Sequence, residues 1–504
     1  MQRVKSVSNR SSWHSNTSMI GCTLIFLLST GCVAPIYLPS NSELDQLSPC
    51  LWFYGDINAE LRDAGIFNAG NPLVKGVPFL RSSRFLASFA EKAAASDELY
   101  KDWLLALNQN AIAQAGLLQG RLDQKNQRHS RLLDCGSKLV ADLASKRKWR
   151  PLLVKRTRIP TNYRNWRRFV GLYPLAVIPF KWGVVRDQSR FRQQEERYLT
   201  QLPDASFQYF GAVSYSLQVN EQPAEEAFTI TFPALREKIS AFPYLTESDR
   251  MALLRAYSPI FALPKLEDGI VADYDSPGTP SAETFDSRKP GIYSYIDFGR
   301  FQNQITIRLN YVVWFSERPR KKGLDLLSGD LDSLVWRVHL LPNGGVLAWD
   351  TVHSCGCWYR IYPAEGMLIR PSGKFFTEPV YVGKTLLPNS PRKLLYLASG
   401  THHIDAVRDV DRFIKTTSTV RFAPLKSYSE LLAQQPPMFD SEGIVKRSKR
   451  VERWLFWPMG IISAGAMRAS GSQAIAFIGK RHFDDPFLLE EVGLESESRI
   501  TLKK

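Results

Sequence analysis

The sequence predicts an α+β protein, with a helical N-terminal half followed by an antiparallel β-sheet domain over about residues 290–410. Between residues 82 and 147, apolar residues recur at threes and fours, β-branched residues are few and proline is absent. This pattern is typical of amphipathic helices. After residue 290, short β-branched and aromatic runs alternate with turn residues, which indicates antiparallel strands.

Particular motifs support both halves of this prediction. Ser96 and Asp97 precede "ELYKDWLLAL" and predict the start of a helix. The stretch "VWRVHLLPNGGVLAWDTV" predicts a β-hairpin, because "PNGG" supplies residues that tolerate a positive φ. A Ser-, Pro- and Asp-rich stretch over 268–290 is too long for an ordinary tight turn and predicts a functional loop or a linker.

The N-terminus carries a targeting pattern. Arg3, Lys5 and Arg10 are not accompanied by any acidic residue, and "IGCTLIFLLSTG" follows as an apolar run. The run is too short for a spanning helix, which needs roughly 20 predominantly apolar residues. Its length fits the apolar core of a secretory signal peptide instead.

The run ends in "LLSTGC", which resembles the lipobox of bacterial lipoproteins. The resemblance implies cleavage after Gly31 and attachment of lipid, palmitate included, to Cys32. Val33 rather than Asp follows the cysteine, which by the same resemblance implies an outer-membrane anchor facing the periplasm. Ser29 departs from the family, which usually has Leu there, so ordinary secretion and an uncut anchor stay open as alternatives.

On this basis the chain divides into six parts. They are a signal peptide (1–31), a tether and leading segment (32–81), a mainly helical domain (82–265), a loop or linker (266–290), an antiparallel β domain (291–440), and a C-terminal segment packing on the body or on a membrane interface (441–504).

The charge balance is strongly basic. The 504 residues have a formal net charge of +16, whereas 44% hydrophobic and 23% charged residues are ordinary for a folded protein. Behind a signal peptide, such a surplus is expected to meet anionic lipid head groups, lipopolysaccharide or peptidoglycan rather than nucleic acid, or merely to aid solubility.

Two stretches combine apolar residues with basic ones. In 146–185, arginines and lysines interleave with Trp149, Tyr163 and Trp166 before an apolar run with two prolines. This composition suits a membrane interface, and the alternative is a solvated basic face followed by a buried strand or turn. The segment 453–467 is apolar but too short to span a bilayer, and predicts either core or an interfacial segment.

With Cys22 in the signal peptide and Cys32 acylated, four thiols remain: Cys50, Cys135, Cys355 and Cys357. The periplasm oxidises thiols, and the simplest pairing by sequence distance joins Cys50 to Cys135 and Cys355 to Cys357.

The strongest chemical signal is "DTVHSCGCWYRIYP". His353, Cys355 and Cys357 share one face of a strand if the second strand of the hairpin continues. With His402 or His403 as a fourth ligand, they predict a site for zinc or another transition metal. A Cys355–Cys357 disulfide, two buried thiols, or thiol chemistry are the alternatives.

No catalytic residue can be named from the sequence, which contains no P-loop, G-x-S-x-G or H-E-x-x-H motif. The expectation is therefore a lipid-anchored envelope protein with a binding or structural role, rather than an enzyme. The alternative is a metal-dependent periplasmic hydrolase centred on His353, Cys355 and Cys357.

Overall fold

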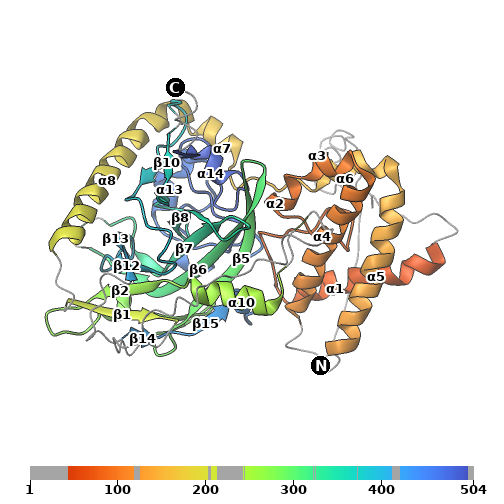
Figure 1. Ribbon diagram of the computed structural model, residues 1–504, viewed down its shortest axis with the longest axis horizontal. Helices are drawn as coiled ribbons and strands as arrows, with labels where there is room; N and C mark the ends of the chain where they lie inside the picture. Colours follow the sequence, from red (N-terminus) through yellow and green to blue (C-terminus); the bar gives the residue numbers. More distant parts are fainter. Residues whose placement is uncertain are drawn as a thin grey trace, which may run out of the picture.

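The computed structural model describes residues 44–118, 125–201, 206–212, 242, 245–321, 323, 325–371, 373–410 and 420–497. The predicted signal peptide and its lipidation site, Cys32, lie outside these residues. Within them the predicted α+β class is confirmed, with a body of helices beside a larger body built on two sheets (Figure 1).

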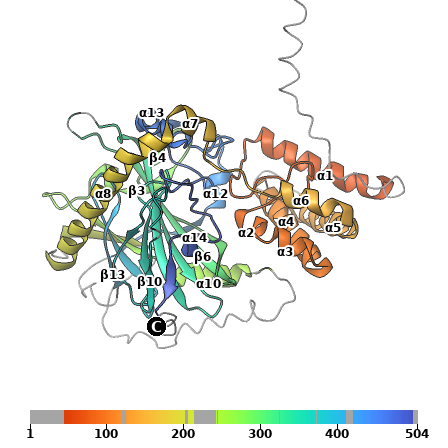
Figure 2. The same ribbon diagram turned by 90° about the horizontal axis from the view of Figure 1, so that it is seen from above.

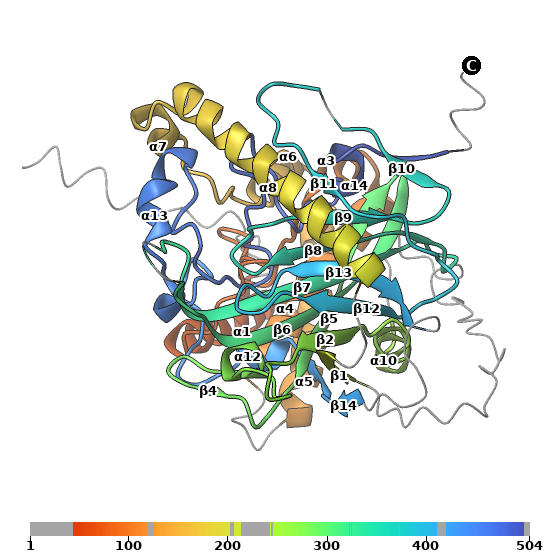
Figure 3. The ribbon, with the colours of Figure 1, turned by 90° about the vertical axis from the view of Figure 1, so that its left-hand side faces the viewer.

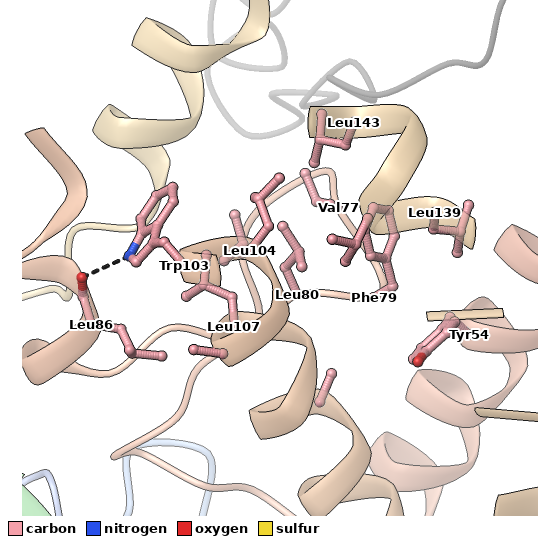
Figure 4. Packing of buried hydrophobic residues seen from close by; sticks show 14 of the residues in the cluster. Tyr54, Val77, Phe79, Leu80, Leu86, Trp103, Leu104, Leu107, Leu139 and Leu143 are labelled. Carbon is pink, nitrogen blue, oxygen red and sulfur yellow. Dashed lines mark hydrogen bonds between the residues drawn. The ribbon is translucent and has the colours of Figure 1, made fainter. Parts of the chain in front are cut away.

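The helical body folds around one apolar core. Its longest helices are amphipathic, and the predicted start at Ser96 is confirmed, because the Ser96 side chain accepts a hydrogen bond from the Leu99 amide. Trp103 lies at the centre of the core and its indole N–H donates to the Leu86 carbonyl at 2.8 Å (Figure 4). The helices are α1 (Leu44–Asp63), α2 (Arg84–Ala87), α3 (Ala90–Ala94), α4 (Asp97–Gly116), α5 (Lys125–Ser145) and α6 (Arg150–Arg156).

A disulfide between Cys50 and Cys135 joins α1 to α5 across 85 residues of sequence. Beside it, the Tyr54 hydroxyl donates to the Leu132 carbonyl at 3.0 Å. Closing so long a loop restricts the unfolded chain, which is the main way in which a disulfide stabilises a fold.

The larger sheet has nine strands, and its longest strands are antiparallel neighbours in the order β5–β6–β7–β8–β9. The predicted hairpin is confirmed: β7 and β8 pair in antiparallel register, and Gly344 in the turn has φ +86°. The strands are β3 (Pro277–Pro280), β4 (Phe285–Asp286), β5 (Ile292–Phe301), β6 (Gln304–Arg318), β7 (Gly329–Leu340), β8 (Val346–His353), β9 (Arg360–Pro363), β11 (Tyr381–Val382) and β15 (Leu425–Ser427).

A second sheet of five strands differs from the expectation in two ways. It is mixed rather than antiparallel, because β12 pairs β2 and β14 pairs β1 in parallel. Two of its strands come from the range predicted as mainly helical; they are short and almost wholly buried, and such apolar runs cannot be told from buried helix by periodicity. The strands are β1 (Phe207–Gly211), β2 (Ile260–Pro264), β12 (Lys393–Leu397), β13 (Ile404–Asp409) and β14 (Val420–Phe422).

The two sheets pack face to face over a shared apolar core that includes Phe261 and Trp336. The other face of the five-stranded sheet packs against Tyr198 and Leu199 of α8 (Tyr173–Gln201), which runs diagonally across this side of the molecule (Figure 3). The chain reaches α8 through α7 (Asn165–Val170), and α10 (Glu247–Ala256) leads into β2. Among the described helices, none combines the length and apolar character needed to cross a bilayer.

The C-terminal segment packs on the outer face of the larger sheet. Ile475, Phe483 and Leu488 are buried there against Trp314 and Val352. It follows α12 (Ser429–Leu432) and contains α13 (Glu452–Leu455), α14 (Leu488–Glu491) and β16 (Leu494–Ser496), which pairs with β10 (Met367–Ile369).

The stretch predicted as a loop or linker, 266–290, is an integral part of the β body. It contributes β3 and β4 to the larger sheet, and its Asp275 is buried. The Asp275 carboxylate accepts hydrogen bonds from the Ser399 hydroxyl at 2.6 Å and from the Gly400 amide at 2.7 Å. The prediction of a linker is therefore wrong for this stretch, because it pairs into the sheet and its Asp275 serves as a buried acceptor.

Candidate functional site

The motif that stood out in the sequence forms a tight turn at the end of β8. The His353 amide donates to the Cys357 carbonyl at 3.1 Å, and the Gly356 amide donates to the His353 carbonyl at 2.7 Å. Gly356 has φ +91°, and a Cβ there would lie only 2.1 Å from the Ala474 carbonyl oxygen. Only glycine therefore fits at this position, where the backbone of the C-terminal segment presses on the turn.

The carboxylate of Asp332, at the start of β7, is contacted by two imidazoles and one guanidinium group. Nδ1 of His353 lies 3.1 Å from one oxygen and Nδ1 of His402 lies 3.0 Å from the other, while Arg450 approaches to 3.4 Å. Burial alone would raise the pKa of Asp332, but His353, Arg450 and the hydrogen bonds from both imidazoles hold it well below its usual value. Asp332 is therefore ionised and its partners compensate the buried charge.

The imidazoles of the predicted metal site are engaged elsewhere. His402 also places Nε2 3.1 Å from Asp275, and although burial lowers its pKa, hydrogen bonds to Asp275 and Asp332 raise it overall. A protonated imidazole has no lone pair for a metal. His403 places Nε2 3.0 Å from Asp405, and burial lowers its pKa to about 4.

The structure does not bring His353, Cys355, Cys357, His402 and His403 around one point. Within the described ranges, no group of three or more His, Cys, Asp or Glu side chains is arranged to hold a metal ion. The sulfurs of Cys355 and Cys357 are free thiols rather than a disulfide. The pKa of Cys357 is raised well above its usual value by its hydrogen-bonded neighbour Cys355 and by burial, which disfavours the thiolate that metals and electrophiles require.

The turn instead forms part of the wall of a cavity. The cavity has a volume of about 450 Å³ and lies between the first half of α8, the Cys355–Arg360 segment and α13. This volume lies within the range of small-molecule sites. Its aromatic walls include Phe180, Phe191, Trp358, Tyr381, Phe456 and Phe477.

Three buried arginines also line this cavity: Arg318, Arg360 and Arg450. Part of each guanidinium group is already engaged. Arg318 lies over the Trp358 ring and Arg360 lies over the Phe191 ring. Arg450 donates a hydrogen bond to the Leu331 carbonyl. Each also keeps one buried nitrogen (Nη1, Nη2 and Nε, respectively) that finds no hydrogen-bond partner within the described part of the chain. Buried donors are normally satisfied, so these three nitrogens are available to an acceptor in the cavity, such as water or an anion.

Three acidic residues, Asp187, Glu378 and Glu452, also line the cavity, and burial raises the pKa of each, so they offset this charge only in part at neutral pH. Burial raises the pKa of Glu452 to about 7, against the opposing effect of Arg450 and Arg318. Burial likewise raises the pKa of Glu378, although the amides of Ile478 and Phe477 donate to its carboxylate. The cavity is therefore an apolar space with a surplus of positive charge, suited to an anion that carries an apolar body.

Sequence reasoning located the Cys355–Cys357 turn but missed the rest of the cavity. Arg318, Arg360 and the pair Arg450 and Glu452 come from three separate segments, and no local spacing relates these segments to one another. The available signal was the apolar run at 172–185, since α8 supplies Phe180, Gly183 and Val184 to the cavity wall.

Glu452 predicts a measurable pH dependence. An exposed glutamate ionises near pH 4.5, whereas Glu452 in the folded protein stays protonated to about pH 7. The contribution of protonated Glu452 to stability is therefore fully present below about pH 4.5 and is lost as the pH rises from there to about 7. Glu452→Gln, which cannot ionise, is expected to gain up to about 3 kcal/mol in unfolding free energy relative to the wild type between pH 5 and pH 8. Denaturant unfolding at both pH values measures this difference.

The exposed Glu365 provides the control, because Glu365→Gln removes the same charge outside the cavity. A difference between Glu452→Gln and the wild type that stays the same at both pH values would contradict the raised pKa.

Comparison with protein-family models, with curated proteins and with solved structures gave no match to this chain. A function must therefore be argued from the chemistry of the cavity rather than from relatives.

Proposed function

We propose that this protein is a lipid-anchored protein of the bacterial cell envelope that binds an amphipathic molecule, with an anionic head and an apolar body, in the cavity beneath α8. The observation that carries the proposal is the meeting of three incompletely bonded, buried arginines with aromatic walls in one cavity. The role is binding rather than turnover, because the cavity presents no activated nucleophile.

The chemistry of the walls defines the class of ligand. Guanidinium groups match carboxylates and phosphates, with which they form charge-assisted hydrogen bonds. The aromatic side chains offer an apolar body a dry environment worth about 0.8 kcal/mol for each buried methylene. A fatty acid is the simplest molecule that combines both features.

The anchor supports the same setting. The lipobox resemblance implies attachment of Cys32 to the outer membrane on its periplasmic face, where amphipathic molecules are abundant. Two or more acyl chains on one residue give stable anchoring without a spanning helix.

The first prediction concerns the cavity. Gly183 lines it, and a Cβ at this position has no atom within 4 Å. A leucine there would displace about two methylenes of the ligand, so Gly183→Leu is expected to weaken fatty-acid binding at least tenfold, or by about 1.4 kcal/mol. Displacement of a fluorescent fatty acid from the purified full chain measures the affinity.

Gly55→Leu is the matched control, because Gly55 is also helical, lies in α1 and has no atom near its Cβ. A fatty alcohol of equal chain length has the same apolar body without the negative charge, so comparing it with the acid isolates the contribution of the head. The alcohol is expected to bind more weakly than the acid. The proposed ligand class would be wrong if Gly183→Leu and Gly55→Leu bound the fatty acid with equal affinity. It would also be wrong if the wild type bound the acid and the alcohol with equal affinity.

A second prediction concerns the anchor. Labelled palmitate supplied to cells is expected to appear on the wild-type protein and on Cys22→Ser, but not on Cys32→Ser. Mass spectrometry of the mature N-terminus checks the same modification directly. An unmodified thiol at Cys32 would refute lipidation while leaving the cavity proposal intact.

The alternative from the sequence, a metal-dependent periplasmic hydrolase, rests on the clustering of His353, Cys355 and Cys357 alone. Elemental analysis of the purified chain tests it. Stoichiometric zinc or another transition metal that is lost in His353→Ala, but kept in the exposed-helix control His129→Ala, would revive it. Metal absent from all three proteins would end it.

A further inference from the structure

The outward side of α7 and α8 is unusually apolar for a surface exposed to water. Trp182 and Phe169 are 79% and 85% exposed. Contiguous exposed patches of this kind mark sites of interaction with other proteins or with membranes. We call the following residues the docking face: Phe169, Val170, Leu172, Leu175, Ile178, Trp182 and Val185.

The first half of α8 is apolar on two sides. Leu175, Ile178, Trp182 and Val185 follow one another at spacings of three and four and are exposed, so they share one stripe of the helix. On the other side, Phe180 and Val184 line the cavity. A helix that is apolar on both sides is normally buried on both, which leaves the outer stripe in need of a cover.

Neighbouring segments extend the docking face. Trp166 of α7 meets Trp457 edge to face at 5.5 Å, and Tyr173 stacks on Phe376 at 6.5 Å. These contacts bring the 3-10 turn Trp457–Met459, which closely follows α13, and the 375–376 segment beside α7 and α8, and Figures 2 and 3 show α13 near α7. The 375–376 segment and the 451–455 stretch add exposed apolar side chains: Phe375, Phe376, Val451, Trp454 and Leu455.

The charge around this face is mainly positive. From Arg164 to Arg192 the chain has seven basic residues and one acidic residue, Asp187. Lys181 lies over the Phe375 ring at 4.6 Å, and Arg186 and Arg192 are exposed. Tryptophan beside lysine and arginine is the composition of a membrane–water interface, where rings sit at head-group level and cations meet lipid phosphates.

We propose that the docking face lies on an anionic lipid bilayer, as a second membrane contact separate from the N-terminal lipid. A second copy of this chain is disfavoured as the cover, because an isologous dimer would set the same basic border against itself. A bilayer with anionic lipids complements both the apolar stripe and its basic border.

This contact goes beyond the proposed ligand binding and does not depend on it. It places one side of α8 on the bilayer while the other side forms the wall of the cavity. The segment 146–185 then functions as an interfacial element, one of the two readings that its composition allowed.

The test uses a local probe, so that attachment through the N-terminus does not obscure the result. Val185→Cys on the docking face and Leu133→Cys on α5 are matched in exposure, at 52% and 50%. Each variant of the full chain carries an environment-sensitive dye and is mixed with vesicles containing phosphatidylglycerol and a lipid-borne quencher. The dye at position 185 is expected to be quenched at least about threefold more than the dye at 133, because only the docking face enters the interface.

A second variant makes the test specific. Leu175→Asp with Trp182→Asp is expected to abolish the quenching at position 185, whereas Trp52→Asp, which changes an exposed tryptophan on α1, leaves it unchanged. Replacing phosphatidylglycerol with phosphatidylcholine is expected to reduce it. The parent chain without an added cysteine gives the background from its own thiols.

Equal quenching at positions 185 and 133, or none at 185, overturns the proposal. A blue shift at 185 that precedes vesicle addition and grows with protein concentration also overturns it, in favour of a second copy. Fatty-acid affinity and the mass of the N-terminal residue are separate measurements, so failure of this contact is distinguishable from failure of the proposed function.

Discussion

The buried carboxylate of Asp332 is the interaction on which the β body depends. Through His353, His402 and Arg450 it ties together the end of β8, the turn between β12 and β13, and the C-terminal segment. His402 carries the connection on to Asp275. Removing one partner of such a buried group leaves an uncompensated charge, at a typical cost of about 3–5 kcal/mol. A single ionised group thereby connects the larger sheet, the turn between β12 and β13 of the second sheet, and the C-terminal segment.

The contacts of Asp332 also position part of the cavity wall. Because His353 is held by Asp332, the turn that follows it brings Cys355, Cys357 and Trp358 to the cavity, and Arg450 reaches both the carboxylate and the cavity wall. In this arrangement His353 and His402 hold the buried carboxylate of Asp332. Their burial explains why groups that suggested chemistry in the sequence have little access to a substrate.

The sequence predicted what depends on local pattern. The helix start at Ser96 and the β7–β8 hairpin follow from side chains a few residues apart, and both are present. The sequence also showed the clustering of histidines and thiols, but it did not predict that the imidazoles of His353 and His402 contact a buried carboxylate. Asp332 lies 21 residues from His353 and 70 from His402. No local sequence pattern could therefore predict that its carboxylate contacts Nδ1 of both imidazoles. The cavity was hidden for the same reason, since its arginines meet only after the chain has folded. The short strands β1 and β2 escaped detection because burial on both faces removes the alternation that marks a strand.

The two proposals meet at α8. One side of its first half forms the cavity wall and the other side carries the docking face. The inward Phe180 and Val184 are four positions apart, and the outward Trp182 lies between them in the sequence. A displacement of the helix by contact with lipid would therefore alter the cavity, and a ligand that moved the wall would alter the fit to the bilayer. Such coupling is reciprocal by thermodynamic necessity. Pro179 within the helix has no amide hydrogen to donate to the preceding turn, so one backbone hydrogen bond is missing where the two surfaces share a wall. The backbone of α8 therefore lacks one stabilising hydrogen bond at Pro179, in the part of the helix that would couple lipid contact to the cavity.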